Sequence, residues 1–401
     1  MTQIQRNKAL ATATAVLRTL CTLCATGTLF QTFLSSVGFT EREIYLNATL
    51  VQAVNVGTIL LFSHFADTRR PHIRSAFVLI PNGILFLAYL PFCFDSGARS
   101  FLLLTTVSLL QSVCTALNTV CEYKLPYLLY RPTDYATVQA IIGVLGAVAT
   151  FGVGELLHYL EARVPYDRLM LYIFPIAALF FVLAGVLTLF YSLLSPKEEK
   201  KDAPAKEYRA RAINIFRRPV FYLLLPANLL RGFASGVVTV LATVAIALGF
   251  GAELTTRMVS LSAIANLAAC FLFGLASRRL SPRVSILVGS LCFLLLPLCL
   301  GSSPFLFLIA YAIVYFGRSI VDVAVPSLLI RAVDAEIAGP YNAWRMILHN
   351  GGTLLATAIA SFLSPGALLI TALVCSVFSG LSFFALPLLR AASPTLLPKG
   401  K

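Results

Sequence analysis

Two arginines, Arg18 and Arg231, stand at matching places inside long apolar runs, in the segments VLRTL and LLRGF. A charged side chain inside an apolar span costs about 2.5–3.5 kcal/mol, so such residues are rare unless they serve a function. A guanidinium stays ionised and presents a planar fork of donors that fits a carboxylate or a phosphate. The pair therefore predicts either a binding site for an anionic group or contacts between helices to acidic side chains.

Two acids, Glu122 and Asp322, also lie in apolar runs, 200 residues apart. The segments around them, EYKLPYLLYRPTD and DVAVPSLLIRAVD, align without a gap and share a proline, a leucine pair and an arginine. Arg318 precedes Asp322 by one helical turn, so the two can neutralise each other on one helix face. Alternatively, Asp322 is released from Arg318 and titrates when a proton or a solute arrives. We predict Glu122, Asp322 and Arg318 as ion-coupling residues.

A polar helix face is predicted in the apolar run 337–362, where positions 342, 345, 349 and 352 share one side. From this run we predict that Arg345, His349 and Asn350 join Arg18 and Arg231 in binding a substrate. His349 is also a candidate proton-coupling group, because imidazole ordinarily titrates near neutrality. A hydrogen-bonded structural histidine is the alternative.

Helices must position these residues, and the composition is that of a membrane protein. Of the 401 residues, 58% are hydrophobic and 12% are charged, whereas charged residues make up about a quarter of soluble domains. A bilayer core of about 30 Å is crossed by about 20 apolar residues in a helix, and runs of that length recur along the chain. We therefore predict an all-α membrane protein with twelve transmembrane helices. Their predicted ranges are 9–38, 43–65, 73–94, 100–127, 135–160, 168–194, 219–248, 253–276, 283–300, 304–330, 337–362 and 366–390.

The positions of lysine and arginine predict the topology. With a cytoplasmic N-terminus, 21 of these residues fall in cytoplasmic segments and 5 in outer ones, so both termini of this cell-membrane protein are expected in the cytoplasm. The formal net charge of +14 is then a topology signal, and no nucleic-acid partner is expected. The longest polar segment, 196–218, is predicted to be a cytoplasmic linker between an N-terminal six-helix bundle, 1–195, and a C-terminal one, 219–401.

The segment SHFADTRRPHIR, residues 63–74, resembles the major facilitator superfamily motif between helices two and three, commonly written GxxxDRxGRR. Asp67 occupies the acidic position, whereas Ser63, Thr68 and Arg70 depart from the motif. Together with twelve spans, a charged central linker and matching halves, the resemblance covers nearly the whole chain. It implies two pseudo-symmetric six-helix bundles around a central cavity that opens alternately to the two sides. It also implies a cytoplasmic gate, for which the candidates are Asp67, Arg69, Arg70, Arg278 and Arg279.

No catalytic or cofactor motif accompanies these features. The sequence contains no GxxxxGKS/T phosphate loop, no HExxH or GxSxG motif and no cysteine–histidine cluster, so we expect no enzyme activity, no cofactor and no metal site. The leading interpretation is a monomeric secondary transporter, surrounded by lipid, that couples a small anionic solute to H⁺ or Na⁺, with H⁺ favoured. Two alternatives remain: a proton antiporter that exports lipophilic drugs, and a non-transporting membrane receptor or scaffold.

Overall fold

The predicted all-α architecture is confirmed, because the computed structural model contains helices and no strand among the residues it describes. Those residues are 3–26, 28–67, 70–94, 100–123, 125–130, 132–161, 163–193, 208, 212–215, 219–250, 252–276, 281–301, 303–332, 338–360 and 362–392. The helices of the first half are α1 (Gln3–Thr26), α2 (Thr28–Ser36), α3 (Glu41–Phe62), η1 (Ser63–Asp67), α4 (Pro71–Leu85), η2 (Phe86–Tyr89), α5 (Pro91–Phe94), α6 (Phe101–Glu122), α7 (Leu125–Leu129), α8 (Pro132–Glu161) and α9 (Tyr166–Leu189). Those of the second half are α11 (Pro219–Ala247), α12 (Ala252–Ala276), α13 (Pro282–Leu291), η4 (Cys292–Leu300), α14 (Pro304–Ala332), α15 (Ala338–Ala360) and α16 (Pro365–Ala392).

Each of the twelve predicted spans corresponds to one helix or to consecutive helices. Within the described part of the chain, nine stretches are long and apolar enough to cross a membrane, judged by length and composition. The first predicted span is divided between α1 and α2, and the fourth ends at Glu122 before the short α7. Pro126 accounts for the second division, because its ring would clash with the Glu122 carbonyl in a continuous helix but fits the first turn of a new one.

The first span of each half ends in the same way. Gly38 and Gly249 both adopt a positive φ, of 91° and 85°, which glycine reaches without steric cost. The next residue then folds back onto the helix: the amide of Phe39 donates to the Leu34 carbonyl at 2.9 Å, and that of Phe250 to the Ala245 carbonyl at 3.0 Å. This Schellman arrangement satisfies carbonyls that a helix end leaves unpaired. The internal repeat therefore extends to the backbone.

The third span of each half changes from α-helix to 3₁₀-helix. In the first half η2 follows α4, and in the second half η4 follows α13. A proline is the cause in both, because Pro91 and Pro297 each lack the amide that would bond four residues back. The tighter 3₁₀ turn keeps the chain helical across the interruption.

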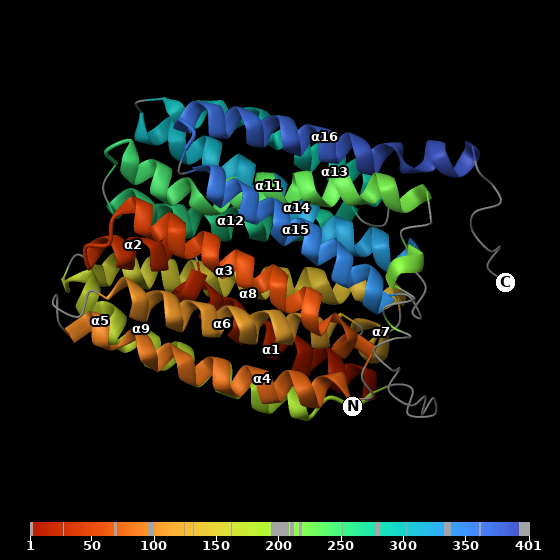
Figure 1. Cartoon of the computed structure of the whole chain (residues 1–401), viewed down its shortest axis with the longest axis horizontal. Helices are drawn as coiled ribbons and strands as arrows, with labels where there is room; N and C mark the ends of the chain where they lie inside the picture. The colour runs from red at the N-terminus through yellow and green to blue at the C-terminus, as the bar shows by residue number, and fades with distance from the viewer. Residues whose placement is uncertain are drawn as a thin grey trace.

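The helices form two groups, as Figure 1 shows: α1 to α9, red to yellow, occupy its lower half, and α11 to α16, green to blue, its upper half. In the first group α4 packs against α6 and α9, and α1 against α8 and α9. In the second group α11 packs against α15 and α16, and α13 against α14 and α16. The main contacts between the groups join α8 to α12 and α3 to α15. α1 begins and α16 ends at the same end of the molecule, on the right in Figure 1.

Glycines bring α11 and α15 into backbone contact. A Cβ atom on Gly232 of α11 would overlap the His349 carbonyl of α15, and one on Gly352 of α15 would overlap the Leu229 carbonyl of α11. Small residues of this kind allow close approach, because packing replaces the hydrophobic effect as the force between helices in lipid. The contact also fixes the rotation of α11, since Gly232 must face α15.

Candidate functional site

A cavity of about 500 Å³ lies between the two halves. It is lined by α1 and α8 from the first half and by α11, α12 and α14 from the second. Most lining side chains are small or carry a hydroxyl or amide group, among them Thr19, Thr150, Thr239, Ser262 and Asn266. Arg18 and Arg318 are the charged residues among the described lining.

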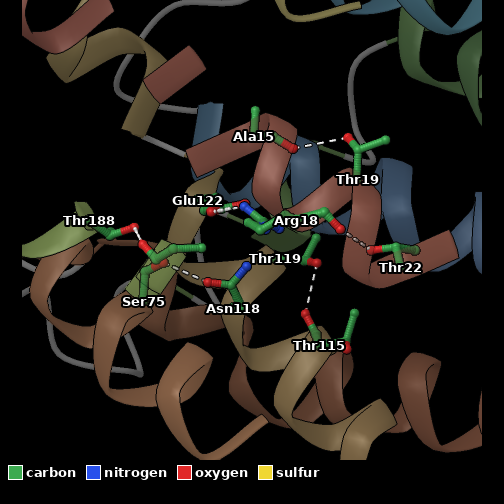
Figure 2. Close-up of polar contacts among 11 residues, drawn as sticks. Ala15, Arg18, Thr19, Thr22, Ser75, Thr115, Asn118, Thr119, Glu122 and Thr188 are labelled. Atoms are coloured by element: carbon green, nitrogen blue, oxygen red, sulfur yellow. Dashed lines mark hydrogen bonds and ion pairs between the residues drawn. The ribbon is translucent and has the colours of Figure 1, made fainter. Parts of the chain in front are cut away.

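Arg18 reaches the cavity from the middle of the first span, 15 residues after Gln3 and 18 before Ser36. Its Nη1 donates a hydrogen bond to Oε1 of Glu122 on α6, and the two side chains face each other in Figure 2. About a quarter of each side chain is exposed, 28% and 27%, so the pair is not sealed in the core. Of the two, Arg18 is among the described residues that line the cavity. The predicted alternative, a contact between Arg18 and an acid of another helix, is the observed geometry.

Arg231 is paired in the equivalent way, with Nη2 donating to Oδ1 of Asp322 on α14. The second carboxylate oxygen, Oδ2, lies 3.6 Å from Nε of Arg318, one turn earlier on the same helix. Arg231 is 11% exposed, whereas Asp322 is 42% exposed, so the arginine lies inside its bundle and the carboxylate borders open space. One carboxylate thus serves two guanidinium groups.

Arg231 does not line the large cavity among the residues that the structure describes. It borders a separate hollow of about 10 Å³ within the second half, together with Asp322 and the hydroxyl residues Ser235, Ser290 and Ser376. Its Nε is buried without a hydrogen-bond partner. A hollow of this size has room for about one water molecule.

The predicted residues of α15 lie beside these pairs and between the halves. His349 is within electrostatic range of Arg231, Asp322, Arg318 and Arg345, and its Nδ1 is buried without a hydrogen-bond partner. Asn350 donates to Oδ1 of Asn55 on α3 at 2.7 Å, which links the two halves. None of the three predicted α15 residues is among the described residues that line the large cavity.

Further polar contacts join the halves on both sides of the cavity. Toward the end where α2 lies, the amide of Gln31 donates to the Thr239 carbonyl at 3.0 Å, and the Thr243 hydroxyl donates to Gln31 at 3.1 Å. Toward the end where α1 begins and α16 ends, Asn342 of α15 donates to the Tyr123 carbonyl after α6 at 3.4 Å. The cavity therefore lies between two levels of contact.

The predicted gate is described only in part. Arg69, Arg278 and Arg279 lie outside the described residues, and for Asp67 only the backbone is described, at the end of η1. Arg70 is exposed and precedes α4, where its carbonyl accepts from the amides of Ile73 and Arg74 at 3.2 and 3.3 Å. Most of the predicted linker, 196–218, also lies outside the described residues.

Two tyrosines in the cavity wall were missed by the sequence interpretation. Tyr311 and Tyr315 line the cavity with Arg318, and the three residues are spaced i, i+4 and i+7 on α14. This spacing places them on one helix face. The signal was present in the sequence, as two aromatic residues one and two turns before a charged one.

Comparison with known proteins agrees with this architecture. The sequence model of the Major Facilitator Superfamily matches residues 11–357. Among curated protein sequences no match to the chain is found. The fold is similar to that of the human organic anion transporter MFSD10 (TETRAN), with a TM-score of 0.68, 16% identity, and coverage of 96% of this chain and 100% of that one.

Two further solved structures have the same fold. A bacterial homologue of the iron transporter ferroportin, in an outward-facing state, has a TM-score of 0.69 at 15% identity, covering 96% of this chain and 100% of that chain. The E. coli fucose:proton symporter FucP has a TM-score of 0.65 at 14% identity, covering 95% of this chain and 97% of that chain. At these identities the likeness concerns the fold, while the sequence model covers most of the chain. The protein described here is an integral membrane transporter that belongs to the Major Facilitator Superfamily.

Proposed function

We propose that this transporter moves a small anionic solute through the central cavity by alternating access, in symport with protons. The observation that carries the proposal is the cavity itself, with guanidinium groups from both halves, Arg18 and Arg318, in its wall. Guanidinium groups attract carboxylates and phosphates and disfavour cations. A volume of about 500 Å³ is in the range of small-molecule sites, which supports a metabolite-sized solute.

Asp322 and Glu122 are the proposed proton carriers. Each carboxylate contacts an arginine of another helix, and Asp322 also borders open space. Protonation of Asp322 would remove the negative charge that Arg231 and Arg318 share and leave Arg318, in the cavity wall, free for an anion. A proton is favoured over Na⁺ because two guanidinium groups beside one carboxylate repel a metal cation, whereas a proton bonds to the carboxylate covalently.

Alternating access is proposed to occur by movement of one half, 1–195, against the other, 219–401, with 196–218 as their linker. The contacts of α8 with α12 and of α3 with α15 provide the surfaces on which they would move. Asp67, Arg69, Arg70, Arg278 and Arg279 remain the proposed gate. The excess of basic residues in alternate loops favours both termini in the cytoplasm. A monomer in the cell membrane is proposed with that orientation.

Two structures of the same fold support these classes of solute and ion. One is named as a human organic anion transporter and another as a fucose:proton symporter. The family thus contains members named for an organic anion and for proton coupling. Neither identity is high enough to transfer a solute, so the solute class here rests on the cavity.

The proposal is tested in proteoliposomes with an inward-directed proton gradient. Uptake of radiolabelled acetate, lactate, benzoate and glycerol 3-phosphate is measured against uptake of glycerol and of a tetraphenylphosphonium dye, with a pH dye inside the vesicles. We expect gradient-dependent uptake of at least one anion, together with internal acidification. Uptake of the cation alone, or of no compound above protein-free vesicles, would contradict the proposal.

A cavity-filling variant makes the same test specific to the site. Thr22→Trp fills the cavity, whereas Thr106→Trp changes an exposed threonine of α6 that lies among exposed leucines. The two threonines are matched, since each donates to the carbonyl four residues earlier, at 2.9 Å for Thr22 and 2.8 Å for Thr106. We expect Thr22→Trp to abolish uptake and Thr106→Trp to retain it.

A further inference from the structure

The two halves differ by one positive charge in clusters that otherwise match. Arg18 and Glu122 in the first half correspond to Arg231 and Asp322 in the second. The residue of the first half that corresponds to Arg318, 200 positions earlier, is Asn118. Asn118 is neutral and accepts a hydrogen bond from Ser75 at 2.6 Å. The second half therefore carries a guanidinium that the repeat does not account for.

Arg318 has no carboxylate of its own among the described residues. Asp322 contacts Arg231 directly, and its distance of 3.6 Å to Nε of Arg318 is too long for a hydrogen bond. The α15 residues nearby cannot supply the missing negative charge, because Arg345 is a cation and His349 is either neutral or a cation. Among the described residues, the carboxylate that balances the charge of Arg318 is therefore Asp322, which is already hydrogen-bonded to Arg231.

Arg318 also stands at the end of an aromatic surface in the cavity. Its guanidinium carbon lies 5.6 Å from the ring centre of Tyr315, and the rings of Tyr315 and Tyr311 are 5.7 Å apart. All three residues line the cavity. A solute that contacts the guanidinium therefore has its remaining atoms beside two aromatic rings, which favour flat, apolar groups.

The size of the cavity excludes a bare inorganic anion as the best fit. Water occupies about 30 Å³ per molecule in the liquid, so about 500 Å³ has room for a solute of ten or more non-hydrogen atoms. Phosphate would leave most of this volume to water. An organic anion with a carbon body of one ring fills more of it and brings apolar atoms to the tyrosines.

We propose that the solute is a small organic monoanion with a flat apolar body, whose anionic group binds Arg318 and whose body packs on Tyr311 and Tyr315. One negative charge is specified because Arg18 retains Glu122 and Arg231 is not among the described residues of the cavity wall, which leaves the Arg318 guanidinium available. The anionic group of the solute then takes the place of the long contact from Asp322. This inference rests on the proposed function and names its solute class and its principal contact.

The test measures the binding of four probes to the purified full-length protein in detergent. Binding is detected by the shift in melting temperature and by calorimetry. The probes are benzoate, its neutral analogue benzamide, its dianionic analogue phthalate, and inorganic phosphate. We expect benzoate to bind at least about tenfold more tightly than each of the other three. Benzamide lacks the charge, phthalate brings a second charge for which no second guanidinium is available, and phosphate lacks the apolar body.

Three variants assign the contact. Arg318→Gln is expected to weaken benzoate binding by about tenfold or more, and Arg318→Lys, which keeps the charge without the planar fork, by less. Arg163→Gln is the matched control, because Arg163 also lies over a tyrosine, Tyr159, at 4.2 Å but is exposed and away from the cavity. Asp322→Asn removes the carboxylate beside Arg318 and is expected to strengthen benzoate binding relative to benzamide binding.

The inference is overturned if benzamide or phthalate binds wild type as tightly as benzoate, or if Arg318→Gln binds benzoate unchanged. If Arg318→Gln does not fold, Arg318→Lys and Asp322→Asn decide the outcome by the same criteria. Failure of the inference is distinguishable from failure of the proposed function. Anion uptake that survives Arg318→Gln leaves transport in place and removes the Arg318 contact, whereas benzoate binding without any anion uptake keeps the contact and removes the transport proposal.

Discussion

The Arg18 guanidinium on α1 donates to the Glu122 carboxylate on α6, 104 residues further along the chain, and neither side chain forms another ion pair among the described residues. We expect Glu122→Gln to destabilise the protein by about 2 kcal/mol, because it leaves Arg18 without a counter-ion in a partly buried place. The melting temperature of the purified protein measures the effect.

The double variant Arg18→Gln/Glu122→Gln is the control for this prediction. Removing both charges leaves neither uncompensated, so its melting temperature is expected to lie above that of Glu122→Gln. A double variant less stable than either single one would mean that the two residues act independently.

Asp322→Asn separates proton coupling from solute movement. The amide cannot carry a proton between the two sides, so a pH gradient is expected no longer to drive accumulation. Exchange of external radiolabelled solute for internal unlabelled solute needs no net proton movement and is expected to continue. Both are measured in the same proteoliposomes, and gradient-driven accumulation at the wild-type level in Asp322→Asn would exclude this residue as the proton carrier.

Gly143→Cys tests whether the halves move at the contact of α8 with α12. A Cβ atom at Gly143 lies 3.2 Å from Cβ of Cys270, so an introduced thiol and the native one are within reach of a disulfide. We expect oxidation with copper phenanthroline to stop transport and dithiothreitol to restore it. Gly152→Cys is the control, since Gly152 is on the same helix and has no atom within 4 Å of its Cβ position. Full transport by the cross-linked protein would place the movement elsewhere.

Two glycine-to-alanine changes are expected to have opposite effects on stability. Gly232→Ala places a methyl group against the His349 carbonyl and forces α11 away from α15, at a cost of about 1–3 kcal/mol. Gly57→Ala, on α3, has no atom within 4 Å and is expected to stabilise the helix by up to about 1 kcal/mol. Thermal unfolding of the two variants measures the signs, and equal shifts would contradict the close contact.

The helices and the matching of the halves could be predicted from the sequence, because both depend on local patterns. Apolar runs define helices, and the repeated residues Arg18 with Arg231 and Glu122 with Asp322 define equivalent places. The offset of 200 residues at Glu122 and Asp322 also locates Asn118 as the counterpart of Arg318. The charge difference between the halves was thus available before the structure.

The rotation of each helix about its axis could not be predicted, and it decides which side chains face the cavity. Arg231 was expected to bind substrate with Arg18, yet it lies within its own bundle because the adjacent Gly232 must face α15. Arg318 was assigned to ion coupling and lines the cavity as well. Such rotations are set by contacts between segments that are distant in the sequence. The spacing of residues along one helix does not reveal these contacts.

The 3₁₀ stretches η2 and η4 have a consequence for the match between protein and bilayer. The ninth span, Pro282–Leu300, has 19 residues, which as an α-helix would reach only about 28 Å, less than the hydrocarbon thickness of about 30 Å. A 3₁₀-helix rises about 2.0 Å per residue, so the nine residues of η4 lengthen this span to about 33 Å. The prolines that interrupt the hydrogen bonding thus let a short span cross a membrane of ordinary thickness without thinning the lipid around it.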